Sequence, residues 1–266
     1  MKQTTLKDRF VLSGKGLHTG LEITAEFLPA PENHGYKFQR TDIEGEPVID
    51  AVAENVVATN RGTVIGRGDV VISTVEHALS ALYAAGIDNC LIRINAPEMP
   101  ILDGSAKEYC AKIVEVGVVE QTADKDFYIV KQKIEVRDDT TGSSIVVLPD
   151  EDFSIDTMVA FDSPVLANQF ASLEKLDDYA KEIASSRTFV FVREIEPLVK
   201  NNLIKGGDLS NAIVIYDSPL SQPELDHIAD IMNVAHKNVS EFGYVNDLPL
   251  MAENEPARHK LLDVLG

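Results

Sequence analysis

Near the start of the chain, hydrophobic and polar positions alternate in the manner typical of β-strands. The pattern predicts strands at Thr5–Leu12 and Leu21–Phe27, of which the second alternates cleanly. The glycine-rich segment Gly14–Gly20 between them has the composition of a turn. We therefore expect the chain to open with a hairpin-like pair of strands.

Helical spacing follows over Thr74–Ala85 and Ala106–Val116, and a glycine comes directly after each segment, as at many helix ends. A short apolar strand is predicted between them at Cys90–Ile94. These elements define a first domain over residues 1–123. The charged stretch Asp124–Asp126 is the expected linker.

The second half repeats the order of strands followed by helices, although it shows no convincing sequence repeat of the first. A second domain is expected over residues 127–266. Its predicted strands are Phe127–Val136, Ser144–Leu148, Phe153–Val159 and Ala212–Tyr216, and its predicted helices are Asp177–Glu182, Arg193–Lys200 and a final helix that carries His259.

Composition narrows the class of protein. With 266 residues, 44% of them hydrophobic and 25% charged, the chain can bury one large core or two smaller ones. It has no apolar run near the ~20 residues that cross a bilayer, and Met1–Thr4 does not open a signal peptide. We therefore expect no transmembrane segment and a cytoplasmic protein. Cys90 and Cys110 are too few for a disulfide framework and are expected to be buried apolar residues.

The charge balance bears on possible partners. With 24 basic and 43 acidic residues, the net charge of −19 opposes nucleic-acid binding, which requires a basic face. It also opposes long-range attraction of any other anion. An anionic substrate would need a local basic patch, for which Lys260, Arg187 and Lys205 are candidates, although each could equally be a solvated surface charge.

Candidate metal ligands lie far apart in the sequence. His259 and Asp263 are four residues apart, so on a helix they share a face, and His77 on another helix would complete a set of three. Two nitrogens and one oxygen with an open fourth position are typical of hydrolytic zinc. Glu76, beside His77, is then a spare carboxylate.

Each of these patterns also has a structural alternative. Ser73 and Glu76 fit a capping box at the start of a helix, which is the favoured interpretation when that motif is taken alone. His259 could cap or pair on a solvated helix. A second histidine-rich set, His227, Asp230 and His236, does not fall on one helical face and is expected to be exposed to solvent.

Several sequence blocks, taken in order and with their spacing, resemble the zinc-dependent UDP-3-O-acyl-N-acetylglucosamine deacetylases of the lipid A pathway. The blocks are Ser13–Gly20, Ser73–His77 with Ala81-Leu82, Gly86–Asn89, Pro100–Ala106, Ser186–Phe189, Arg193–Glu196, Gly206-Gly207 with Asn211–Val214, and Arg258–Lys260 with Leu262-Asp263. They extend along nearly the whole chain.

The resemblance implies an α+β fold of two α/β sandwich domains related by pseudo-symmetry, with the active site between them. It implies Zn²⁺ held by His77, His259 and Asp263, with Glu76 as general base. It further implies that the Thr188 hydroxyl and the Lys260 charge stabilise the oxyanion formed when water attacks an acetamide.

The implied substrate is a UDP-linked, acylated glucosamine. Its acyl chain would lie in a hydrophobic passage, and His18 would be a substrate-side group, although a structural histidine is an open alternative. The expected passage residues, each of which could instead be an ordinary core residue, are Leu17, Phe191, Ile195, Ile204, Leu209 and Val214.

Three features depart from the family pattern. Family members continue beyond the final helix into a Ser-Gly-His block, so we expect this chain to be less active and to leave Leu261, Leu262 and Leu265 partly uncovered. Val190 stands where glycine is usual. The long stretch Leu220–Pro256, with an expected helix over Glu224–Val239, resembles forms fused to a hydroxyacyl-carrier-protein dehydratase, so such a domain is possible after Gly266.

Two other functions stay open at this point. The chain could be an inactive fragment that retains metal or lipid-sugar binding, or an interaction module in which the same blocks serve only the fold.

Overall fold

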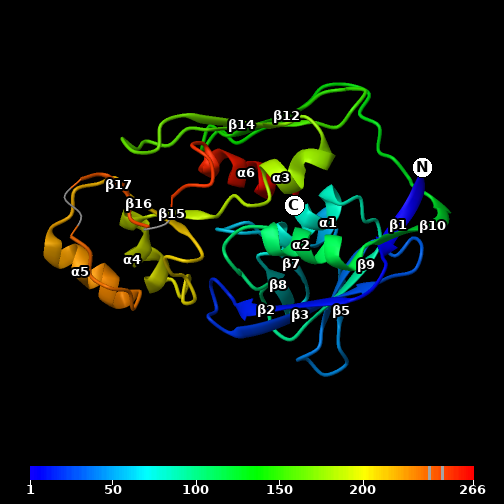
Figure 1. Cartoon of the computed structure of the whole chain (residues 1–266), viewed down its shortest axis with the longest axis horizontal. Helices are drawn as coiled ribbons and strands as arrows, with labels where there is room; N and C mark the ends of the chain where they lie inside the picture. The colour runs from blue at the N-terminus through cyan, green and yellow to red at the C-terminus, as the bar shows by residue number, and fades with distance from the viewer. Residues whose placement is uncertain (239–240, 247–248) are drawn as a thin grey trace.

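A computed structural model describes residues 1–238, 241–246 and 249–266 (Figure 1). The fold is α+β, as expected. Two layers of strands lie on the outside, and helices from both halves of the chain face one another between them (Figure 1). The residues of the site project from these central helices.

The first half is built on a five-stranded sheet with the order β2-β3-β9-β4-β5. Along β3, Ile23, Ala25 and Phe27 are buried and their neighbours are more exposed, so the alternation read from the sequence is present. The elements of this half are β1 (Lys2–Leu6), β2 (Phe10–Lys15), β3 (Glu22–Pro29), β4 (Tyr36–Arg40), β5 (Val48–Asp50), η1 (Ala53–Asn55), β6 (Val56–Ala58), β7 (Val64–Arg67), β8 (Val70–Ser73), α1 (Glu76–Ala84), β9 (Cys90–Ile94), α2 (Lys107–Val116) and β10 (Val118–Asp124).

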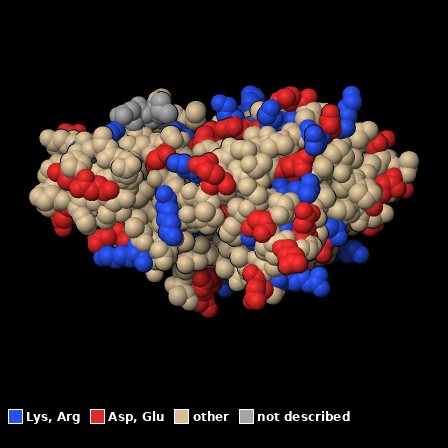
Figure 2. Space-filling view, turned by 90° about the horizontal axis from the view of Figure 1, so that it is seen from below, with Lys and Arg blue, Asp and Glu red and all other residues tan. Residues whose placement is uncertain are grey.

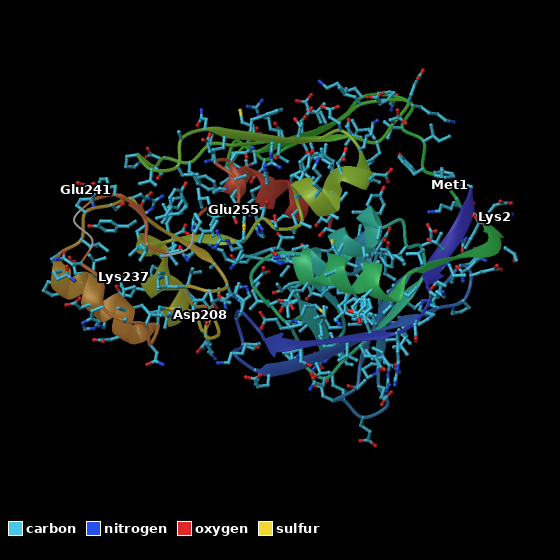
Figure 3. All side chains as sticks on the ribbon, in the orientation of Figure 1. Met1, Lys2, Asp208, Lys237, Glu241 and Glu255 are labelled. Atoms are coloured by element: carbon cyan, nitrogen blue, oxygen red, sulfur yellow. The ribbon has the colours of Figure 1, made fainter. Side chains whose placement is uncertain are left out.

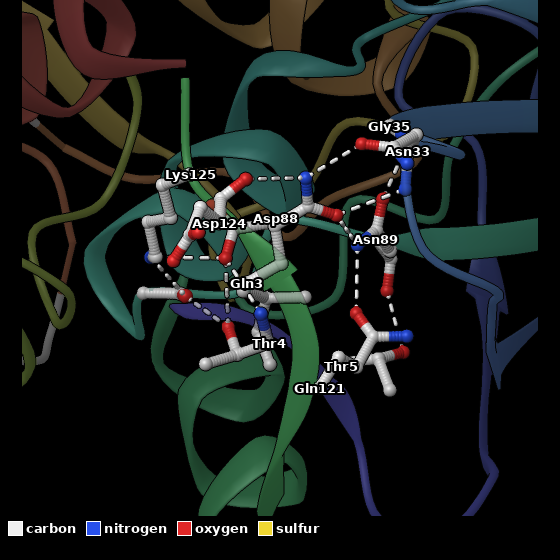
Figure 4. A network of polar contacts seen from close by, with 12 residues as sticks. Gln3, Thr4, Thr5, Asn33, Gly35, Asp88, Asn89, Gln121, Asp124 and Lys125 are labelled. Carbon is white, nitrogen blue, oxygen red and sulfur yellow. Dashed lines mark hydrogen bonds and ion pairs between the residues drawn. The ribbon is translucent and has the colours of Figure 1, made fainter. Parts of the chain in front are cut away.

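The predicted strand Thr5–Leu12 is in fact two strands. β1 pairs with β10, whereas β2 pairs with β3 in the main sheet. The break falls at Lys7, Asp8 and Arg9, which are all exposed and interrupt the buried face. A network of buried amides around Asn89 joins β1 to the neighbouring turns (Figure 4).

In the second half, the antiparallel hairpin β13-β14 packs on α6, the hairpin β11-β12 has exposed side chains throughout, and a small sheet of order β15-β16-β17 lies beside α4 and α5 (Figure 1). Its elements are β11 (Ile134–Arg137), β12 (Ser144–Val147), β13 (Ile155–Val159), β14 (Gln169–Leu173), η2 (Leu176–Asp178), α3 (Tyr179–Glu182), β15 (Phe189–Phe191), α4 (Val192–Lys200), β16 (Ile213–Tyr216), α5 (Gln222–Ile231), β17 (Gly243–Tyr244) and α6 (Glu255–Leu265).

Two predicted boundaries in this half are wrong. The expected strand Phe127–Val136 is extended but mostly unpaired until Ile134, because its side chains are exposed and face no buried layer. The helix expected over Glu224–Val239 begins earlier, at Gln222, after a capping box in which Ser221 and Glu224 bond reciprocally, and it ends at Ile231. Val239 lies outside the described residues.

The main hydrophobic core contains residues of both halves. Ala257, Leu261 and Leu262 of α6 pack in one cluster with residues of the first-half sheet and of α1. The expectation that Leu261 and Leu262 would be partly uncovered is therefore wrong, since both are fully buried, although Leu265 is half-buried. The final helix is an integral part of the core.

No helix in the described part of the chain is both long and apolar enough to cross a membrane. The molecular face in Figure 2 carries acidic and basic side chains interspersed among uncharged surface. Cys90 is buried as expected, whereas Cys110 is only partly buried.

Candidate metal centre and active site

The three predicted metal ligands converge between α1 and α6. His77 comes from the first turn of α1, and His259 and Asp263 occupy one face of α6. Their ligand atoms all lie within 4.8 Å of one another. The two imidazole rings lie edge to face with centroids 5.1 Å apart. Both histidines are buried, so the alternative of a solvated His259 is wrong.

The surroundings orient these ligands. The Nδ1 of His259 lies 2.9 Å from the Ser186 carbonyl, to which it donates as N–H, and this leaves the Nε2 lone pair available toward Asp263. Lys260 donates to the other oxygen of Asp263 at 2.7 Å. The Nδ1 of His77 is buried and has no hydrogen-bond partner of ordinary geometry among the described residues, although the nearby Ser105 backbone acts to raise the pKa of the ring. An orphaned buried nitrogen beside a free imidazole nitrogen and a carboxylate is a donor set that fits zinc.

The protonation states of His77, His259 and Asp263 are those that suit metal binding. Burial lowers the pKa of His77 and of His259, so both imidazoles are neutral near pH 7. Burial opposes ionisation of Asp263, but the neighbouring His259, Lys260 and His77 outweigh it and lower the pKa of this carboxyl below its ordinary value. Neutral imidazoles and an ionised carboxylate are the states that bind a divalent metal.

Glu76 is buried at the start of α1 without belonging to the ligand set. Its Oε2 accepts a hydrogen bond from the Thr63 N–H at 3.0 Å, and burial raises the pKa of its carboxyl. The capping-box alternative is wrong, because α1 begins at Glu76 itself and the Ser73 hydroxyl donates to the Pro97 carbonyl instead. The carboxylate therefore remains available for chemistry.

Thr188 lies on the wall of a cavity, and Lys260 lies beside the candidate ligand Asp263. Thr188 lines the cavity and is two residues from Ser186, whose carbonyl holds His259. Its backbone is fixed by a donated bond to Gly104 and by one accepted from Ile213. Lys260, half-buried, places its ammonium 5.6 Å from the centre of the Phe189 ring.

The cavity is apolar and lies between the first-half turn at Leu17 and the helices α4 and α5. The predicted substrate residues that line it are Leu17, His18, Ile195, Ile204, Leu209 and Val214. Phe191 is not among its lining residues. It packs with Leu166, Ile213 and Ile215 in a separate cluster, on the face of β15 opposite to Val190, whereas Val190 and Phe189 at the start of the strand both line the cavity.

Sequence reasoning missed one whole wall of the cavity. α5 contributes three apolar residues to it, namely Leu225, Ile228 and Ala229, and Met232 directly after the helix contributes a fourth. Their spacing is that of one helical face, and this signal was available in the sequence. It was overlooked because α5 lies outside the blocks that carry the family resemblance. His227, Asp230 and His236 are exposed on this segment, as predicted.

The candidate basic patch is smaller than expected. The Arg187 side chain is 4% exposed and forms a bidentate ion pair with Glu255, at 2.9 and 3.1 Å. It is therefore a structural cation. In Figure 3 Glu255 lies in the middle of the molecule, at the start of α6. Lys205 is exposed and Lys260 is half-buried.

The comparisons with known proteins agree with this geometry. The profile of the family described as LpxC, UDP-3-O-acyl N-acetylglycosamine deacetylase, matches residues 3–238. The whole chain is 61% identical to the bifunctional enzyme LpxC/FabZ of Bacteroides thetaiotaomicron and 59% identical to that of Porphyromonas gingivalis, of which it covers 58% and 57%. It is 39% identical to the UDP-3-O-acyl-N-acetylglucosamine deacetylase of Methylococcus capsulatus and covers 80% of it.

The chain belongs to the UDP-3-O-acyl N-acetylglycosamine deacetylase family. It spans a little over half the length of its bifunctional relatives. The resemblance read from the sequence blocks is therefore confirmed at the level of the family.

Proposed function

We propose that this chain removes the acetyl group of UDP-3-O-(3-hydroxyacyl)-N-acetylglucosamine by zinc-dependent hydrolysis, a step of lipid A biosynthesis. The observation that carries the proposal is the convergence of His77, His259 and Asp263 beside the unused carboxylate of Glu76. A scaffold without catalytic function has no need of two buried, neutral imidazoles that face one carboxylate. A cytoplasmic location is part of the same proposal.

Zinc fits the three ligands by donor type, burial and protonation state. Held by His77, His259 and Asp263, it would supply a Lewis acid for the acetamide carbonyl and bring the pKa of water toward ~7.

Glu76 is assigned the role of general base. Its carboxyl is held by one backbone N–H and accepts the proton of the attacking water on its remaining lone pairs. A pKa raised by burial makes it a stronger base than an exposed glutamate. Thr188 would donate its hydroxyl to the developing oxyanion, and Lys260 would add positive charge nearby.

The apolar cavity suits the acyl chain of such a substrate. Its walls come from α4, α5 and the Leu17 turn, and His18 and Thr188 are among its polar lining residues. Fatty acyl chains bind in preformed apolar passages of this kind. Lys205 is an exposed cation near the turn at Gly20 and could meet the anionic nucleotide.

The first test measures metal content and deacetylation together. We expect close to one zinc per chain after supplementation, and acetate release from the acylated UDP-sugar. His259→Ala should lose most of the zinc, because its Nε2 is a ligand, whereas the matched control His236→Ala should keep it, because His236 is exposed and bonds Asp230.

Two results would replace the proposal. Folded chain that binds zinc but releases no acetate would identify an inactive fragment that retains metal binding. Folded chain that takes up no zinc after supplementation would favour an interaction module.

A further inference from the structure

Glu98 is a fully buried carboxylate outside the catalytic set. Four groups donate to it. Its Oε1 accepts from the His18 N–H at 2.7 Å and the Thr74 hydroxyl at 3.3 Å, and its Oε2 accepts from the Thr19 N–H at 2.8 Å and the Thr19 hydroxyl at 2.7 Å. These donors belong to two segments that are distant in sequence.

One of the two segments leads into the metal centre. Thr74 has a backbone φ of 58°, which is costly for a β-branched residue and needs support from its surroundings. It comes two residues before Glu76 and three before His77. The Glu98 strand segment also pairs with this backbone at Ser73, whose carbonyl accepts from the Met99 N–H. Glu98 thus stabilises the backbone at Ser73 and Thr74, directly before α1.

The other segment is the turn that forms a wall of the cavity. Leu17 and His18 line the cavity, and Glu98 holds the amides of His18 and Thr19. A Cβ on Gly16 would come within 2.3 Å of Glu98 Oε2, so only glycine lets the turn lie this close to the carboxylate.

The same turn reaches the second half of the chain. Gly206 donates its N–H to the Leu17 carbonyl at 3.0 Å, and a Cβ on Gly206 would meet the Gly16 carbonyl at 2.2 Å. Gly206 follows closely on Ile204, another cavity residue. A single carboxylate therefore connects the approach to α1 with the Leu17 turn, and the Leu17 turn itself bonds the Ile204 turn.

We propose that Glu98 is a positioning residue that holds the cavity wall in register with Glu76 and His77, so that a substrate anchored by its acyl chain presents its acetamide to the site. The kinetic part of this inference rests on the proposed deacetylation. A buried carboxylate with four donors is suited to this task because a glutamine has only one acceptor oxygen and cannot satisfy the Thr19 N–H as well.

The test is Glu98→Gln, studied with substrates of long and short acyl chains. We expect kcat/KM for the long-chain substrate to fall about 10- to 100-fold, mainly through KM, because misplacing an anchored substrate by about 1 Å has effects of this size. The short-chain substrate should lose much less. Zinc content should be unchanged, because the three ligands are untouched.

Amide hydrogen exchange supplies a readout that needs no catalysis. In Glu98→Gln the amides of His18, Thr19 and Gly206 should exchange faster than in the unsubstituted chain, while amides of β3 should not change. Thr19→Ser keeps the hydroxyl and should behave as the unsubstituted chain, whereas Thr19→Val should share the defect. If Glu98→Gln does not fold, the contrast between Thr19→Ser and Thr19→Val tests whether the bonds to Glu98 position the cavity wall.

Asn89→Ala is the matched control, because Asn89 is equally buried in a polar network away from the cavity (Figure 4). It should reduce stability without changing acyl-chain discrimination. The inference is overturned if Glu98→Gln discriminates acyl chains normally, or if Asn89→Ala changes discrimination equally. If the unsubstituted chain releases no acetate, the proposed function fails, and faster exchange at His18 and Thr19 still separates a positioning role from none.

Discussion

Glu76 and Asp263 are neighbouring carboxyls, the first buried and the second partly buried, with different surroundings. Asp263 faces two histidines and a lysine that lower its pKa, whereas burial dominates at Glu76 and raises its pKa. A site that separates the properties of two carboxyls in this way can use one as a ligand and the other as a base.

Glu76→Gln tests this division of roles. The variant should keep its zinc but lose about 10²- to 10⁴-fold in deacetylation rate, the usual contribution of a positioned base. Glutamine retains an oxygen to accept the Thr63 N–H, so α1 should not be disturbed. Metal analysis and turnover measured on the same preparation check the prediction. Loss of both zinc and fold would instead give Glu76 a structural role.

Asp42, in the turn that follows β4, leads to a prediction about how the stability of the fold depends on pH. Hydrogen bonds from the buried Arg40 lower the pKa of Asp42, an effect only partly opposed by burial. A carboxyl with a lowered folded-state pKa stabilises the fold above its unfolded pKa of ~3.9, and this contribution is lost as pH falls through the folded value.

Asp42→Asn should therefore cost stability near neutral pH, by about 1–3 kcal/mol, and the difference should shrink below about pH 4. Urea denaturation of both chains at several pH values measures it. A difference that stays constant with pH would contradict the ion-pair explanation.

At the scale of elements, the sequence predicted the α-helices, but it missed about half of the described strands, namely β4 to β8, β10, β14, β15 and β17. The alternation in β3 and the final helix were readable because their buried faces repeat with a fixed period. The break between β1 and β2 and the extent of α5 depended on exposed charges and on a capping box, which outweighed the longer patterns. That α1 and α6 meet was implied only by the expected set of metal ligands, since the apolar pattern of neither helix specifies its partner.

The Arg187–Glu255 pair is what fixes the first turn of α6 against the segment that carries Ser186. Glu255→Ala would leave a buried guanidinium unpaired and should destabilise the fold by about 3–5 kcal/mol. Glu115→Ala breaks an exposed pair with Lys112 and should cost less than about 1 kcal/mol. Denaturant midpoints of the two variants check the contrast. Equal, small effects would show that water or another group compensates Arg187.

At the scale of the molecule, the net charge of −19 acts against the proposed anionic substrate. Raising the salt concentration from about 10 to about 100 mM shortens the range of that repulsion from ~30 to ~10 Å. We expect kcat/KM for the UDP-linked substrate to rise roughly twofold or more over this range. An uncharged acylated glucosamine should show little change. A fall with salt for the UDP-linked substrate would reveal a local basic site strong enough to dominate.

The convergence of His77, His259 and Asp263 could be predicted from the spacing in α6 together with the family resemblance, since a four-residue interval defines one helical face. The cavity could be predicted only in part. Its wall from α5 belongs to a segment without family motifs, and the placement of Phe191 depends on which face of a three-residue strand meets the cavity. Side-chain direction in so short a strand is set by tertiary packing.

Because the candidate ligands lie far apart along the chain, they can come together only late in the synthesis of the protein. His77 belongs to the first long helix and His259 to the last, and both pack in a core that α6 completes. On the ribosome, the first-half sheet can form while α6 is still being made, but the metal centre cannot. If the proposed zinc site is real, a nascent chain has no complete set of ligands until α6 has emerged and docked, so metal capture would report the docking of α6.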